Sequence, residues 1–124
     1  MSFSKEKTEH YTIVRLQAER LDSLNAPELK AEFTLLGSDG VANVILDLEK
    51  VQYCDSSGLS SILVGNRLCK NSNGLLVLTG AQPTVKKLIT ISQLDTVLNM
   101  VPTVSEAIDY LFMASIENDL NETE

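Results

Sequence analysis

Apolar residues recur along the chain at two different spacings, which predict strands in some segments and helices in others. Residues 11–16 alternate in the manner of a strand, and residues 3–8 predict a weaker strand that pairs with it as a hairpin. Residues 41–48 and 75–78 are almost wholly apolar, which is typical of strands buried on both faces. A short edge strand is predicted at residues 97–98.

Helical segments lie between these strands. A first helix is predicted to begin after Asn25, a residue type that caps helix starts, and to end at the turn of residues 38–40. The central helix is predicted at residues 56–70, the third begins at Pro83, and the last follows a capping box at residues 103–106. Strands that alternate with helices require crossover connections. The pattern therefore predicts an α/β domain with a mixed, mostly parallel sheet of four to five strands and about four helices.

The length and the charge of the chain limit the classes of protein to which it can belong. The chain has 124 residues, the size of one domain, and a formal charge of −7, which is poorly suited to the phosphates of nucleic acid. Lys and Arg end at Lys87 while acidic residues continue, so we assign residues 1–115 to the domain and residues 116–124 to a frayed acidic tail. There is no run of about 18 apolar residues to span a membrane and no apolar secretory signal, so a cytoplasmic protein is expected.

The sequence offers little catalytic chemistry. Cys54 and Cys69 are the only cysteines and are expected to be reduced and packed. With the single histidine, His10, they form no metal-ligand cluster, and neither a metal nor a cofactor is expected. Ser56 and Ser57 lack the Gly-x-Ser-x-Gly turn of serine hydrolases, and the only candidate base, His10, precedes the strand of residues 11–16. An enzyme is therefore not predicted.

The junction between the strand of residues 41–48 and the central helix carries the main candidate chemistry. Asp55, Ser56 and Ser57 have side-chain oxygens that accept hydrogen bonds from the free N–H groups of a helix start. One interpretation is an ordinary helix cap. The other is a phosphorylatable serine on an exposed helix start, beside Gly58, where a partner backbone can come close. No Lys or Arg follows Ser56 before Arg67, so a phosphate there is expected to change docking rather than the fold.

A second polar segment follows the strand of residues 11–16 and contains Asp22 and Asn25. Because the carboxyl ends of parallel strands meet at one edge of a sheet, these residues are expected to lie near Asp55 and Ser56. The combined patch is acidic and rich in hydroxyl groups, as a binding surface can be. The alternative, two ordinary capped turns, stays open at this point.

These segments resemble the signatures of the STAS domains, the family of the anti-sigma factor antagonists. The resemblance is carried by Asp55-Ser56-Ser57-Gly58-Leu59 after the strand Val44-Ile45-Leu46-Asp47-Leu48, by Arg20-Leu21-Asp22-Ser23-Leu24-Asn25-Ala26-Pro27-Glu28-Leu29, and by Pro83-Thr84-Val85-Lys86-Lys87-Leu88. It extends from about Tyr11 to Met113, with the three motifs in the family's order. It implies the small STAS fold.

The resemblance also implies the function of an anti-sigma factor antagonist. Such a protein binds an anti-sigma factor that is also a serine kinase of the GHKL type, and thereby releases a sigma factor. The kinase inactivates the antagonist by phosphorylating it, a serine phosphatase restores it, and the nucleotide belongs to the kinase. Carried onto this sequence, the phosphoacceptor is Ser56. The residues expected to face the partner are Asp22, Asn25, Asp55, Ser57 and Gly58.

Two positions depart from the commonest family pattern. Glu19 stands where many members carry glycine, and Ser60 follows Leu59 where glycine is frequent. Neither change removes a functional group, and both leave the subfamily open. The second hypothesis is a STAS adaptor subunit of a lipid-transport ABC complex, or a scaffold of the stressosome type. Neighbouring genes distinguish the two, because an antagonist predicts a histidine-kinase-like ATPase and an adaptor predicts transporter subunits.

Overall fold

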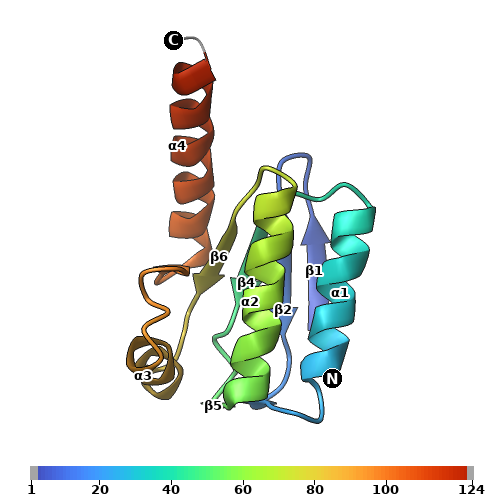
Figure 1. Ribbon diagram of the computed structural model, residues 1–124, viewed down its shortest axis with the longest axis vertical. Helices are drawn as coiled ribbons and strands as arrows, with labels where there is room; N and C mark the ends of the chain where they lie inside the picture. Colours follow the sequence, from blue (N-terminus) through green and yellow to red (C-terminus); the bar gives the residue numbers. More distant parts are fainter. Residues whose placement is uncertain (1–2, 123–124) are drawn as a thin grey trace.

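The computed structural model describes the backbone of residues 3–122 and the side chains of residues 3–117. Its elements in chain order are β1 (Phe3–Lys7), β2 (Thr12–Leu16), β3 (Arg20–Leu21), α1 (Ala26–Ser38), β4 (Val44–Asp47), β5 (Tyr53–Cys54), α2 (Ser56–Asn71), β6 (Leu76–Thr79), α3 (Pro83–Ile91), β7 (Asn99–Val101) and α4 (Val104–Glu122). Figure 1 shows α1 and α2 side by side against the sheet, with α3 at its lower edge.

Five strands form the main sheet in the order β1-β2-β4-β6-β7. β1 and β2 are antiparallel, which confirms the predicted hairpin, and the remaining pairs are parallel. A separate two-stranded sheet pairs β3 with β5 in parallel. The predicted α/β fold, with four helices and a mostly parallel five-stranded sheet, is therefore confirmed.

The central strands are buried on both faces because helices cover both. The row that faces α1 and α2 is Val14, Leu46 and Leu78, which lie in register. The row that faces α4 is Ile13, Ile45 and Val77, also in register. Each of these side chains is at most 3 % exposed. Double burial explains why these strands are almost continuously apolar in the sequence.

α1 and α2 lie close together because Gly65 of α2 leaves room for the ring of Phe33 of α1. A Cβ atom at Gly65 would lie 2.5 Å from two carbons of that ring. Leu59 and Ile62 of α2 complete this layer of the core. The packing fixes where α2 begins, and with it the position of the Ser56 backbone.

Two predicted strands differ from the observed ones. The strand expected at residues 41–48 is confined to β4, because the N–H of Val41 donates to the carbonyl of Leu36 at 2.9 Å and completes the turn after α1. The N–H groups of residues 97–98 both donate to the carbonyl of Leu94 in a turn. The edge strand therefore forms after this turn, as β7.

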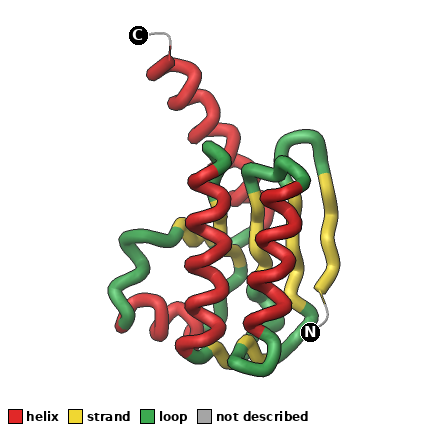
Figure 2. Tube along the Cα trace, turned by 45° about the vertical axis from the view of Figure 1, so that its right-hand side comes forward, coloured by secondary structure: helices red, strands yellow, loops and turns green. Residues whose placement is uncertain are grey.

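α4 begins with the predicted cap, since Thr103 Oγ1 accepts a hydrogen bond from the N–H of Glu106 at 3.2 Å. Ala107 and Leu111 pack on the sheet, and the helix then continues beyond it (Figures 1 and 2). In the segment expected to form the acidic tail, the backbone is part of α4 as far as residue 122. None of the helices within residues 3–122 combines the length and apolar character needed to cross a bilayer.

Candidate partner-binding and phosphorylation site

The two-stranded β3–β5 sheet joins the two segments that the sequence singled out. Arg20 is paired with Tyr53, and Leu21 with Cys54. The N–H of Asp55 then donates to the carbonyl of Leu21 at 3.2 Å. The segments that begin at Asp22 and at Asp55 therefore leave the same end of one small sheet. We call this surface, made of residues 20–25 and 53–57, the rim.

Asp22 holds its own turn together more than it faces solvent. Its Oδ1 accepts from the N–H of Leu24 at 3.0 Å, and its carbonyl accepts from the N–H groups of Asn25 and Ala26 at 3.2 and 2.8 Å. Its Oδ2 lies 3.3 Å from Nε of Arg20, and its side chain is only 15 % exposed. In the free protein this carboxylate is therefore already bound within the rim.

Asn25 occupies the predicted cap position of α1, but its side chain does not cap that helix. Its Oδ1 accepts from the N–H of Asp22 at 2.9 Å, and its Nδ2 donates to the carbonyl of Arg20 at 2.7 Å. The amide thus reaches backward and ties the end of β3 to the start of α1. The expectation of a side-chain cap is wrong, because these two backbone groups of the preceding turn use the amide instead.

Arg20 is a cation of the rim that sequence reasoning missed. Its guanidinium lies 4.2 Å from the centre of the Tyr53 ring, in addition to the contact with Asp22. It is remote from Ser56 in sequence, yet Tyr53 precedes Ser56 by three residues. Only the strand pairing places it here. No apolar periodicity signals strands of two residues, so the sequence offered no sign of this neighbour.

Asp55 caps α2 as the first interpretation predicted. Its Oδ1 accepts from the N–H of Gly58 at 2.9 Å, and its backbone is extended. Ser56, the first residue of α2, is exposed, whereas Ser57 is half-buried. The helix start supplies free N–H groups and a positive dipole end, and both favour an anion nearby. An exposed hydroxyl group thus stands beside a bound carboxylate at an electropositive helix end.

Gly58 was expected to let a partner backbone come close, but the backbone beside it belongs to the same chain. Gly58 is buried, and a Cβ atom there would overlap the carbonyl oxygen of Leu21. The same Cβ would lie 2.8 Å from Sγ of Cys54. The glycine is needed so that the first turn of α2 can rest on β3 and β5.

The cysteines are free, as predicted. Burial, with the Asp55 carboxylate as a smaller cause, raises the pKa of Cys54 to about 12. Burial likewise raises the pKa of Cys69 to about 11. Both thiols therefore stay protonated at neutral pH and pack as apolar groups rather than act as nucleophiles.

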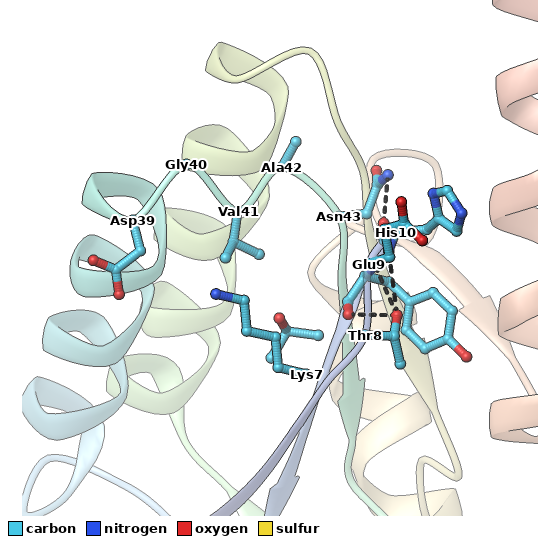
Figure 3. A pocket seen from close by; sticks show the side chains of 11 residues that line it. Lys7, Thr8, Glu9, His10, Asp39, Gly40, Val41, Ala42 and Asn43 are labelled. Carbon is cyan, nitrogen blue, oxygen red and sulfur yellow. Dashed lines mark hydrogen bonds between the residues drawn. The ribbon is translucent and has the colours of Figure 1, made fainter.

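A polar groove lies at the other end of the sheet. Figure 3 shows it between the β1–β2 turn, residues 7–12, and the α1–β4 loop, residues 39–43. His10 lines this groove, whereas α2 begins at the opposite end of the main sheet (Figure 1). His10 is therefore placed too far away to act as a base toward Ser56. Among the side chains that the structure describes, residues 3–117, no three of His, Cys, Asp or Glu gather in a way that fits a metal ion.

Comparison with known proteins agrees with this architecture. Residues 2–107 match the family model of the STAS domain. BtrV of Bordetella bronchiseptica, assigned by name to the anti-sigma factor antagonists, is 32 % identical over 92 residues, which cover 74 % of this chain and 78 % of BtrV.

Solved structures show the same fold. The phosphorylated form of the Bacillus protein SpoIIAA is 27 % identical, with a TM-score of 0.69 over 88 % of this chain and 98 % of that one. The unphosphorylated form of SpoIIAA, an anti-sigma factor antagonist, is 26 % identical, with a TM-score of 0.69 over 88 % and 96 %. The protein tm1081 of Thermotoga maritima shares the fold, with a TM-score of 0.78 at 23 % identity over 88 % and 93 %. The chain therefore belongs to the STAS domain family and is related within it to the anti-sigma factor antagonists.

Proposed function

We propose that this protein binds an anti-sigma factor that is also a serine kinase of the GHKL type, and that phosphorylation of Ser56 ends the binding. The observation that carries the proposal is the β3–β5 pairing, which brings the segment of Asp22 and Asn25 to the segment of Asp55 and Ser56. On this proposal the rim is the contact surface, the kinase supplies the nucleotide, and a serine phosphatase restores the binding form.

The geometry around Ser56 suits a switch that acts on docking rather than on folding. A phosphoserine carries a charge of roughly −1.5 to −2 at neutral pH. At the start of α2, the free N–H groups and the helix dipole stabilise such an anion, typically by about 0.3–1 kcal/mol. The phosphorylated domain is therefore expected to stay folded.

The same phosphate opposes association. It stands next to the carboxylate of Asp55, and Arg20 already contacts Asp22 and Tyr53. If Arg20 turned toward the phosphate, it would have to leave both contacts. The added charge thus remains at the surface, where desolvation and repulsion weaken a complex shaped around a small hydroxyl group.

The relatives support this proposal at two points. BtrV and SpoIIAA are assigned by name to the anti-sigma factor antagonists, and SpoIIAA is solved both with and without phosphate. Ser57 is the alternative phosphoacceptor. We favour Ser56 because its side chain is exposed, whereas Ser57 is half-buried.

Affinity capture from the source cell tests the proposal. The parent chain and Ser56→Asp serve as baits, and the retained proteins are identified by mass spectrometry. The proposal expects a histidine-kinase-like ATPase on the parent bait and much less of it on Ser56→Asp. Recovery of transporter subunits alone, equally on both baits, would instead favour the adaptor hypothesis.

A further inference from the structure

Leu24 is the most exposed large apolar side chain among residues 3–117, at 88 %. The next is Ile91, at 68 %. A single exposed leucine is common on protein surfaces and by itself indicates nothing. Leu24 differs because of the turn that carries it and because of where that turn lies.

The turn is fixed by hydrogen bonds on both sides of Leu24. The N–H of Leu24 donates to Oδ1 of Asp22 at 3.0 Å, and the N–H of Ala26 donates to the carbonyl of Asp22 at 2.8 Å. The side chain of Asn25 adds two more bonds to the backbone of Arg20 and Asp22. The backbone at Leu24 is thus ordered before any partner arrives. Preorganisation of this kind lowers the entropy lost on binding.

Leu24 also belongs to the rim, beside the residue types that dominate binding energy at protein interfaces. Arg20 and Tyr53 form a stacked pair on β3 and β5, and arginine and tyrosine are enriched among such residues. Asp22 connects Leu24 to this pair, since its carboxylate accepts a hydrogen bond from the N–H of Leu24 and contacts Arg20. An exposed apolar side chain on such a rigid turn has the character of an aliphatic anchor that fills a partner's pocket.

The charge of the rim indicates the partner's chemistry. Arg20 offsets Asp22 within the rim, but Asp55 leaves the rim with a net negative charge. Two copies of this chain meeting through their rims would therefore bring like charges together, and the whole chain carries a formal charge of −7. A second copy is therefore a poor occupant. The complementary surface is an apolar pocket with basic groups around it, on a different protein.

We propose that Leu24 is the apolar anchor of the rim and inserts into an apolar pocket, bordered by basic side chains, on the kinase. This inference rests on the proposed function, because it names the residue that fixes the affinity of the same complex. Full burial of a leucine side chain corresponds to about a tenfold to hundredfold change in Kd.

The test compares the parent chain with Leu24→Ser, Leu24→Met and Leu35→Ser. Leu35 is a matched control, since it is also a leucine and is 50 % exposed, on α1 rather than on the rim. Each variant is titrated against the purified protein that the parent bait captures, and each is also melted thermally. Because both leucines are exposed, at 88 % and 50 %, all variants are expected to melt within about 2 °C of the parent.

The expected result is a Kd about tenfold to hundredfold weaker for Leu24→Ser, near-parental binding for Leu24→Met, and less than about a twofold change for Leu35→Ser. A loss below about threefold for Leu24→Ser, or an equal loss for Leu35→Ser, overturns the inference. If the captured protein is not a kinase, the proposed function fails. The Kd values of Leu24→Ser and Leu35→Ser for that protein then still show whether Leu24 is the anchor of the rim.

Discussion

Replacing Gly58 by alanine places a methyl group at the point where α2 rests on the β3–β5 sheet. The new Cβ would lie 2.8 Å from Sγ of Cys54 and 2.9 Å from Cγ of Leu21, and closer still to the Leu21 carbonyl oxygen. That oxygen cannot simply move, because it accepts the hydrogen bond from the N–H of Asp55. The strain therefore falls on the contact that joins the two halves of the rim.

The expected change in the free energy of unfolding is the sum of three terms, one favourable and two unfavourable. Alanine in a helix is favoured over glycine by about 1 kcal/mol. Overpacking costs about 1–3 kcal/mol, and a broken hydrogen bond about 1 kcal/mol more. We expect Gly58→Ala to lower the free energy of unfolding by about 1–3 kcal/mol. In a domain of this size, that corresponds to a fall in Tm of roughly 4–12 °C.

Gly37→Ala is the matched control. Gly37 also lies in a helix, and a Cβ atom there meets no atom within 4 Å. This substitution is expected to leave Tm unchanged or to raise it. The gain in the free energy of unfolding should be no more than about 1 kcal/mol. Both variants are measured by thermal melting and by urea unfolding. If Gly58→Ala stabilised the protein as Gly37→Ala does, the close contact between α2 and β3 would not exist.

Three further predictions concern the core, the turn and the thiols. Ile45→Asp buries an unpaired charge at a position with 0 % exposure and should cost more than about 3 kcal/mol, so a parental Tm would show that β4 is not central. Asp22→Ala removes the hydrogen bond to the N–H of Leu24 and should lower the free energy of unfolding in urea by about 1–2 kcal/mol. The loss in the free energy of partner binding should be larger, and equal losses would indicate a purely structural turn. A pKa of about 12 leaves only about one Cys54 thiol in 10⁴ ionised near pH 8. Iodoacetamide should therefore alkylate Cys54 far more slowly in the folded protein than in urea. Equal alkylation rates in the two conditions, followed by intact mass, would contradict the burial of this thiol.

The strong patterns in the sequence predicted the fold well. The almost unbroken apolar run around Ile45 requires cover on both faces of the sheet, and α2 and α4 provide it. Asp55 was recognisable as a cap, and α2 begins at the residue that follows it. These elements are set by local periodicity and by capping chemistry, both of which a single sequence displays.

Features that depend on contacts between distant segments were not predictable. β3 and β5 have two residues each, too few for any period, so their pairing and the position of Arg20 near Tyr53 could not be foreseen. For the same reason, the side chain of Asn25 looked like a helix cap, although it bonds backward to β3. Gly58 suggested an opening toward a partner, but tertiary packing fills that space with Leu21.

On the proposed function, the rim is a docking surface controlled by a phosphate on Ser56. The most direct measurement incubates the protein with the captured kinase and ATP, maps the phosphate by intact mass and peptide analysis, and then titrates the phosphorylated protein against the same kinase. We expect one phosphate, on Ser56, a parental circular dichroism spectrum, and binding weakened at least about tenfold. Phosphate on Ser57 instead, or a phosphorylated Ser56 that binds as tightly as the unmodified protein, would contradict the proposed function.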